Sequence, residues 1–129
     1  MMTDPIADML TRIRNAYLAH KKETQVSYSK LKKTLADILV REGYLAGVEE
    51  RRDGNPFLIL NLKYTDGRPA IQSIVRVSKP SYRLYIGKSK IKEVLNGYGL
   101  SIISTPKGML TNHEAKEAGV GGEVICEVY

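Results

Sequence analysis

Two segments near the start of the chain carry apolar residues at the spacing of an amphipathic helix. Asp4 and Pro5 are typical of a helix start, because aspartate can cap free backbone N–H groups and proline fits the first turn. The apolar residues that follow them are Ile6, Leu10, Ile13 and Tyr17. A second helix is predicted to begin at Ser29 and to end near Gly43. Its apolar positions are Leu31, Leu35, Ile38 and Leu39.

After the second helix the pattern changes to that of β-strands. Residues 44–48 and 57–64 are rich in apolar side chains and flank the turn residues 52–55, so they predict a β-hairpin. Residues 24–26, between the two helices, predict a further short strand. Strands are also expected at 71–77, 83–86, 100–104 and 123–129, with a turn at 96–99.

Two short helices are predicted among these later strands. One spans Ser89–Leu95, and the other ends near Ala118 and begins with Thr111 and Glu114, which have the spacing of a capping box. The turn cluster Thr65–Pro69 is the best candidate for a boundary between lobes.

We therefore predict an α+β fold, a mixed α/β protein of two lobes. Residues 1–66 are expected to form an N-terminal lobe of two helices with a small sheet. Residues 67–129 are expected to form a C-terminal lobe of mostly antiparallel strands with short helices.

Positive charge is concentrated in the second half of the chain. The whole sequence has a net charge of +6 and a pI near 9.4. Residues 68–107 alone hold eight basic residues against Glu93, a net charge of +7. Because lysine and arginine release counterions when they contact phosphates, a concentrated basic segment indicates a nucleic acid as partner. Solvated charge on strand and turn faces is the alternative interpretation.

A second group of cations, Lys30, Lys32 and Lys33, lies in the first turn of the predicted second helix. Cations at this end oppose the helix dipole. Either an anionic ligand or simple exposure to water explains their position.

Residues that carry catalysis or bind metals are scarce in this sequence. Cys126 is the only cysteine, so an internal disulfide is impossible, and its apolar neighbours favour a buried side chain. His20 and His113 stand in unrelated contexts without metal-ligand spacing. We expect no enzyme activity, metal, cofactor or small-molecule substrate. A Cys126–His113 acyl-transfer pair is an alternative from another class.

No segment approaches the roughly 18 apolar residues of a membrane span, and Met1–Pro5 lacks the basic and apolar regions of a signal peptide. We therefore expect a cytoplasmic protein that does not enter a membrane.

The segment Ser104-Thr105-Pro106-Lys107-Gly108 places two hydroxyls and a cation after an apolar strand. Hydroxyls suit base edges and the ribose hydroxyl of RNA, and lysine suits a phosphate. Tyr82, Tyr85 and Tyr98 are available nearby in the sequence for stacking on bases. A Pro/Gly turn with incidental hydroxyls is the alternative interpretation.

Several motifs, in order along the whole chain, resemble one family, that of the eighth protein of the bacterial small ribosomal subunit. They are Thr3–Ala16, Ile74–Pro80 with Arg83-Leu84-Tyr85, Asn96–Leu100, Ser104-Thr105-x-Lys107-Gly108 and Gly119–Cys126. The resemblance implies a two-lobed protein that binds the central domain of small-subunit ribosomal RNA and helps to organise the platform of the subunit. It also implies the fifth and twelfth proteins of the subunit as neighbours and, in many members, repression of their own operon through its messenger RNA.

The resemblance also implies RNA-binding residues, and most of them make residues 67–129 the lobe that is expected to read RNA. The main reading element corresponds to Ser104, Thr105, Lys107 and Gly108, beside an aromatic at Tyr85 and an adjoining turn at Gly121, Gly122 and Glu123. Lys30 and Lys33 match a basic helix start that contacts phosphates.

Four positions depart from the family pattern. Pro106 replaces a second serine, which removes a hydroxyl and a backbone N–H. Ser81 replaces a glycine, and Ser27-Tyr28 replaces a common Pro-Ala pair. A nonribosomal RNA-binding regulator on the same scaffold is the alternative function, and it would not co-sediment with small subunits.

Overall fold

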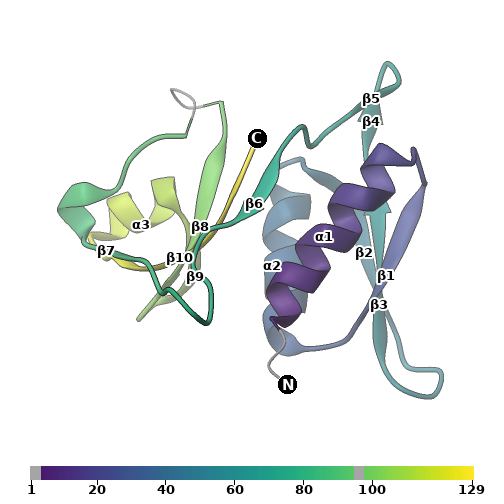
Figure 1. Cartoon of the computed structure of the whole chain (residues 1–129), viewed down its shortest axis with the longest axis horizontal. Helices are drawn as coiled ribbons and strands as arrows, with labels where there is room; N and C mark the ends of the chain where they lie inside the picture. The colour runs from purple at the N-terminus through teal and green to yellow at the C-terminus, as the bar shows by residue number, and fades with distance from the viewer. Residues whose placement is uncertain (1–3, 95–97) are drawn as a thin grey trace. The chain divides into compact units, whose positions relative to one another are not determined.

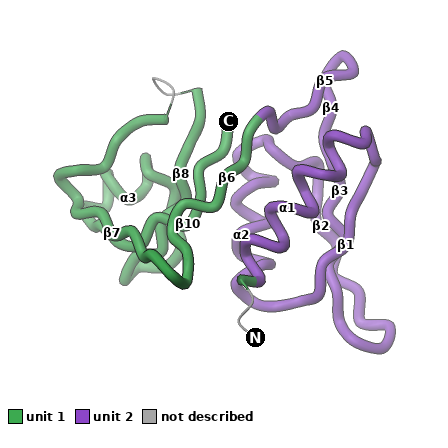
Figure 2. The backbone as a smooth tube through the Cα atoms, in the orientation of Figure 1, with its two compact units in different colours: residues 1–4, 73–129 green, residues 5–72 purple. Residues whose placement is uncertain are grey.

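The computed structural model describes residues 4–94 and 98–129. It divides the chain into two compact units (Figure 2). Unit 2 is Pro5–Gln72, and unit 1 combines Met1–Asp4 with Ser73–Tyr129. Both units mix helices with antiparallel strands, which confirms the predicted α+β fold.

Unit 2 contains the two predicted amphipathic helices. Helix α1 spans Pro5–Leu18 and buries the predicted stripe together with Met9 and Ala16. Helix α2 spans Lys30–Arg41, and its N-cap Ser29 accepts a hydrogen bond from the backbone N–H of Lys32 at 3.1 Å. A serine hydroxyl in this position satisfies one of the free N–H groups of the first turn.

The apolar stripe predicted for α2 is wrong at one position. Leu31 is 48% exposed, and Lys32 is buried in the first turn instead. The Lys32 ammonium donates to the carbonyl and the hydroxyl of Ser27, at 3.1 and 2.8 Å. A lysine can take this place because its aliphatic stem is apolar and its charged end finds acceptors.

The sheet of unit 2 has three antiparallel strands in the order β1-β3-β2. These strands are β1 (Glu23–Ser27), β3 (Phe57–Leu62) and β2 (Leu45–Arg51). Helices α1 and α2 lie on one side of this sheet (Figure 1) and pack on its strands. Strand β3 is central and most of its residues are buried, since it has a partner on each edge.

A small hairpin follows β3. It pairs β4 (Tyr64–Thr65) with β5 (Arg68–Pro69), and the backbone N–H of Ala70 then donates to the carbonyl of Lys63 at 2.9 Å. These bonds keep the turn cluster within unit 2, so the compact units divide after Gln72, beyond the lobe boundary expected after residue 66.

Unit 1 is built around strand β10 (Gly122–Val128). Strand β8 (Leu100–Thr105) pairs along one edge of β10, and β9 (Gly108–Thr111) extends the sheet beyond β8. On the other edge, β7 (Tyr85–Ile86) pairs with the start of β10, and β6 (Ile74–Arg76) pairs with its end.

The structure differs from the prediction in the length of two strands and in the type of one helix of unit 1. The strands predicted at 71–77 and 83–86 are shorter than expected, because each has only two or three residues of β10 to pair with. The helix predicted at 89–95 is a single 3-10 turn, η1 (Lys88–Lys90), and Ile91 is the one described residue of the predicted helix that packs on the core cluster. Residue 95 of that helix, and residues 96–97 of the predicted turn, lie outside the described residues.

Helix α3 (Asn112–Ala118) confirms the capping-box prediction. The Thr111 hydroxyl accepts from the Glu114 N–H at 3.2 Å, and the Glu114 carboxylate accepts from the Thr111 N–H at 3.0 Å. The buried residues Ile103, Ala115 and Val124 form a core cluster between this helix and the sheet.

Candidate RNA-binding surface

The register of unit 1 aligns residues from four strands in one row. Tyr85 of β7 is opposite Glu123 of β10, Glu123 is opposite Ser104 of β8, and Ser104 is opposite Met109 of β9. Directly opposed residues point to the same face of a sheet. The neighbouring pair Val124 and Ile103 points to the other face, into the core cluster. The row therefore faces away from the core cluster.

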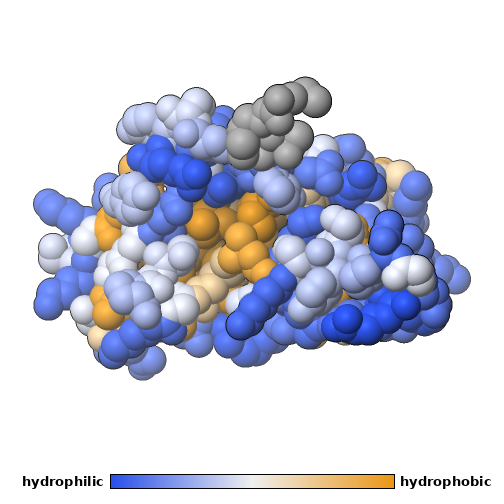
Figure 3. Space-filling view, turned by 90° about the horizontal axis from the view of Figure 1, so that it is seen from below, coloured by the Kyte–Doolittle hydropathy of each residue, from blue (hydrophilic) through white to orange (hydrophobic). Residues whose placement is uncertain are grey.

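Three residues predicted to bind RNA, Tyr85, Glu123 and Ser104, are thus brought side by side although they come from distant parts of the sequence. Tyr85 is 68% exposed and Ser104 is also exposed. We call this row, together with the loop 105–108, the candidate surface. Figure 3 shows one face of the molecule, on which hydrophilic residues predominate.

Gly121 and Gly122 allow the strands of the candidate surface to approach closely. A Cβ atom on Gly122 would lie 2.0 Å from the carbonyl oxygen of Ser104, and one on Gly121 would lie 2.1 Å from that of Ile86. Any larger residue would push β7 or β8 away from β10. The two glycines therefore serve close packing of the backbone.

The loop between β8 and β9 is a tight turn closed by its own side chain. The Thr105 hydroxyl donates to the carbonyl of Gly108 at 2.7 Å and accepts from the N–H of Lys107 at 3.1 Å. Pro106 occupies the turn, where its missing N–H breaks no ladder bond. Gly108 has φ of +105°, a conformation that favours glycine.

This geometry changes the predicted role of the loop. The donor proton of Thr105 is used within the loop, so an RNA group can meet only its remaining acceptor position. Ser104 and Lys107 keep exposed side chains. The loop therefore offers a fixed backbone shape, with a hydroxyl and a cation at its two ends.

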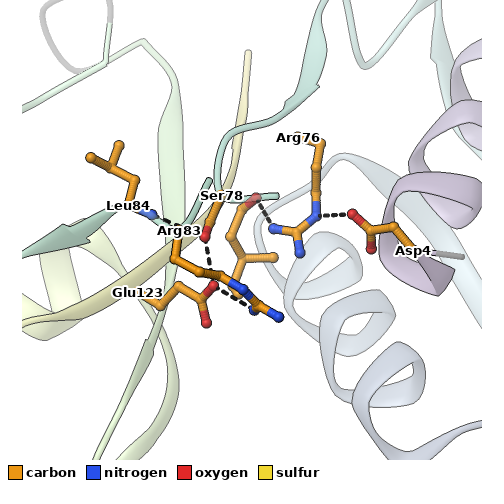
Figure 4. Close-up of polar contacts among 7 residues, drawn as sticks. Asp4, Arg76, Ser78, Arg83, Leu84 and Glu123 are labelled. Atoms are coloured by element: carbon orange, nitrogen blue, oxygen red, sulfur yellow. Dashed lines mark hydrogen bonds and ion pairs between the residues drawn. The ribbon is translucent and has the colours of Figure 1, made fainter. Parts of the chain in front are cut away.

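Glu123 is the centre of a polar network (Figure 4). One of its carboxylate oxygens, Oε2, accepts from the Ser78 hydroxyl at 2.5 Å and from Nη1 of Arg83 at 2.9 Å. The Ser78 hydroxyl in turn accepts from the backbone N–H of Leu84 at 3.1 Å. The hydrogen bond from Ser78, and next the one from Arg83, lower the pKa of Glu123 below its ordinary value.

Arg76 forms a second polar contact in Figure 4. Its Nε donates to Asp4 at 2.9 Å, and its Nη1 donates to the carbonyl of Ile125 at 2.8 Å. Ile125 lies at the irregularity in the β10–β8 register, between Val124 and Cys126. The same carbonyl also accepts from the backbone N–H of Val77 at 3.0 Å, so Arg76 adds a second donor at this irregularity.

Lys30 and Lys33 belong to α2 in unit 2, whereas the other predicted RNA-binding residues belong to unit 1. Lys33 donates to both carboxylate oxygens of Asp37 at 2.9 Å, which raises the pKa of Lys33, and Lys32 is buried. Lys30 is exposed. Fewer of these lysines are therefore available to an anionic ligand at the start of α2 than the sequence predicted.

Sequence reasoning missed Ser78 and did not single out Arg83. Arg83 was visible as one of the basic residues in the segment 68–107 and as part of the motif Arg83-Leu84-Tyr85, but without a role of its own. The link between position 83 and position 123 spans 40 residues, and no local pattern signals it.

The geometry disfavours the acyl-transfer alternative. Cys126 is fully buried, and burial raises the pKa of its thiol to about 12. A nucleophilic cysteine needs the thiolate form, which such a pKa suppresses. His113 lies exposed on α3. Among the described residues, none of the helices is long and apolar enough to cross a membrane, and no cluster of three or more His, Cys, Asp or Glu side chains is placed to hold a metal ion.

Comparison with known proteins gives consistent matches along the chain. The profile of the family described as Ribosomal protein S8 matches residues 4–129. The small ribosomal subunit protein uS8 of Clostridium novyi (strain NT) is 51% identical over 130 residues, covering 100% of this chain and 99% of that protein. The protein of the same name from Thermus aquaticus is 49% identical over 138 residues, covering 100% of both chains.

Proposed function

Since the chain belongs to the ribosomal protein S8 family, we propose that it is a structural constituent of the small ribosomal subunit that binds the subunit's RNA directly. Its target is the central domain of that RNA, and its role is to help organise the platform. The observation that carries this proposal is the row of Tyr85, Glu123 and Ser104 on adjacent strands, beside the closed loop 105–108.

The chemistry of the candidate surface suits an irregular RNA feature. The deep groove of a regular A-form helix hides its bases, so proteins read sites where bases are unstacked or splayed out. An exposed tyrosine such as Tyr85 offers a flat ring for stacking, and Ser104 offers a hydroxyl for a base edge or a ribose hydroxyl. Lys107 offers a cation for a phosphate.

Further parts of the proposal rest on the family resemblance alone. They are assembly beside the fifth and twelfth proteins of the subunit, and repression of the protein's own operon through a messenger RNA that imitates the ribosomal site. The protein acts in the cytoplasm, on the ribosome, without catalysis.

The test is binding of the purified chain to a fragment of the central domain, beside an unrelated hairpin, over a series of salt concentrations. We expect the cognate fragment to bind at least ~1000-fold more tightly, in the range of site-specific recognition. Equal and steeply salt-dependent binding to both RNAs would overturn the proposal. Specific binding to a messenger RNA without co-sedimentation with small subunits would favour a nonribosomal regulator.

A further inference from the structure

Within the proposed RNA-binding function, we infer that Arg83 is a phosphate-binding residue of the candidate surface and that Glu123 is the residue that positions it. Glu123 then acts through Arg83 and does not itself meet the RNA. The inference rests on the proposed function and adds a contact and a division of roles to it.

Arg83 has the exposure and the free donors that a phosphate contact needs. Its side chain is 50% exposed, whereas that of Glu123 is 16% exposed. Within the described part of the chain, Nη1 is its one group with a hydrogen-bond partner, the carboxylate of Glu123. The other N–H groups of the planar guanidinium remain for a second acceptor, and this fork matches two oxygens of a phosphate.

Glu123 is fixed from the protein side. Its Oε2 atom accepts from Ser78, a completely buried residue whose hydroxyl is itself held by the N–H of Leu84. The carboxylate is therefore anchored to residues 78–84, the segment that also carries Arg83. An anchored carboxylate reduces the rotamer freedom of the arginine and so lowers the entropy lost when a phosphate binds.

A direct contact of Glu123 with RNA is disfavoured by its chemistry. An ionised carboxylate can only accept hydrogen bonds, and its pKa is lowered in this network. Near a phosphate backbone an unpaired carboxylate would be repelled. With Arg83 attached to it, the same carboxylate orients a cation.

The arginine pairs of the protein differ in a way that supports this division. Arg51 and Glu49 in unit 2 are two residues apart, and both side chains are about half exposed. Arg76 and Asp4 are distant in sequence, and both are largely buried. Arg83 with Glu123 combines a distant, mostly buried carboxylate with an exposed arginine. Of these three pairs, the last is the one that joins an exposed guanidinium to a carboxylate fixed from a distant part of the chain.

The aromatic residues near Arg83 in the sequence add to the argument. Tyr82 and Tyr85 flank it in the sequence, and both are 68% exposed. Tyr85 is the cross-strand partner of Glu123. A base stacked on either ring would have its phosphate within reach of this segment, which is the usual arrangement of stacking and charge in single-stranded RNA sites.

The experiment measures affinity for the central-domain fragment and for the unrelated hairpin, over a salt series, with the full chain and five variants. These are Arg83→Ala, Arg83→Lys, Glu123→Gln, the double variant of Glu123→Gln with Arg83→Ala, and Arg51→Ala as a control that removes the same charge from another exposed pair. Thermal unfolding is recorded for each. Discrimination by the unchanged chain tests the proposed function separately.

We expect Arg83→Ala to weaken cognate binding about 10-fold. It should also lower by about one the salt slope, which is the steepness with which the logarithm of the binding constant falls with the logarithm of the salt concentration. Arg83→Lys should keep the slope and recover only part of the affinity, because lysine lacks the fork. Arg51→Ala should change the affinity for either RNA little. Glu123→Gln should weaken cognate binding several-fold with Arg83 present and have no effect in the Arg83→Ala background.

The inference about Arg83 fails if Arg83→Ala behaves like Arg51→Ala while the unchanged chain still discriminates between the RNAs. The positioning role fails if Glu123→Gln has the same effect in both backgrounds, whether it weakens or strengthens binding. A loss of thermal stability without this dependence on Arg83 would identify Glu123 as merely structural. Failure of the unchanged chain to discriminate would reject the proposed function itself.

Discussion

The cations at the start of α2 and those near the candidate surface are similar in sequence but different in the structure. On α2, Lys32 is buried and Lys33 donates to Asp37. In unit 1, Arg83 and Lys107 keep exposed ends. The first group is mostly used by the protein itself, whereas the second is available to a partner. A count of basic residues therefore overstates the surface that can bind a phosphate.

The largest expected effect comes from the close packing of strands β8 and β10 at the candidate surface. We expect Gly122→Ala to lower the free energy of unfolding by about 1–3 kcal/mol, because its Cβ would meet the Ser104 carbonyl at 2.0 Å. Cognate RNA binding should fall on the order of 100-fold as the row is pulled apart. Urea unfolding and an RNA titration measure the two effects. Gly87→Ala is the matched control, since its Cβ would meet nothing within 4 Å. Equal effects of both changes would contradict this explanation.

The next effect concerns the closed loop. Thr105→Val removes the bonds to Gly108 and Lys107, so we expect about 10-fold weaker binding of the cognate RNA and almost unchanged binding of an unrelated hairpin. Thr105→Ser keeps the hydroxyl and should retain most of the affinity. Competition binding with the two RNAs is the measurement. Equal losses for both RNAs would remove the loop from specific recognition.

A pair of lysine variants separates the two kinds of cation directly. Lys32→Ala should lower the free energy of unfolding by about 1–2 kcal/mol, because the Ser27 acceptors lose their donor, and should leave the salt slope of RNA binding unchanged. Lys107→Ala should leave stability unchanged and weaken the binding of both RNAs. It should also lower the salt slope of that binding by about one. Reversed results would show that exposure does not decide which lysine binds RNA.

The smallest effect is a dependence of stability on pH. Glu123 has a pKa lowered mainly by Ser78 and then by Arg83, with Arg76 also favouring its charge. Its contribution to stability is therefore present above the ordinary value of 4.5 and is lost as the pH falls through the lower value of the folded state. The difference in unfolding free energy between the unchanged chain and Glu123→Gln should shrink as the pH falls below 4.5. A difference that stays constant to pH 2 would contradict the assigned shift.

Much of the local structure could be predicted because it depends on residues close in sequence. The stripe from Ile6 to Tyr17 repeats at intervals of three or four residues, and the capping box joins Thr111 to Glu114, three residues on; both are confirmed. The hairpin around residues 52–55 is also present as predicted, between β2 and β3. The motifs that resemble the family were likewise recognisable from the sequence.

The predicted strands 71–77 and 83–86 show where such reasoning fails. Their side chains suit strands, yet their lengths are set by how much of β10 each can reach. The prediction that Leu31 is buried on α2 is wrong for a related reason. The acceptors at Ser27 favour burial of Lys32 in its place.

The sequence by itself determined the fold class, the starts of α1, α2 and α3, the basic character of residues 68–107 and the family. The tertiary structure alone decided that Tyr85, Glu123 and Ser104 lie in one row, that Thr105 closes its own loop and that Glu123 holds Arg83. The physical reason is the range of the interactions. Helix caps and stripes join residues within about four positions, whereas strand register and buried polar networks join segments that meet only when the chain has folded.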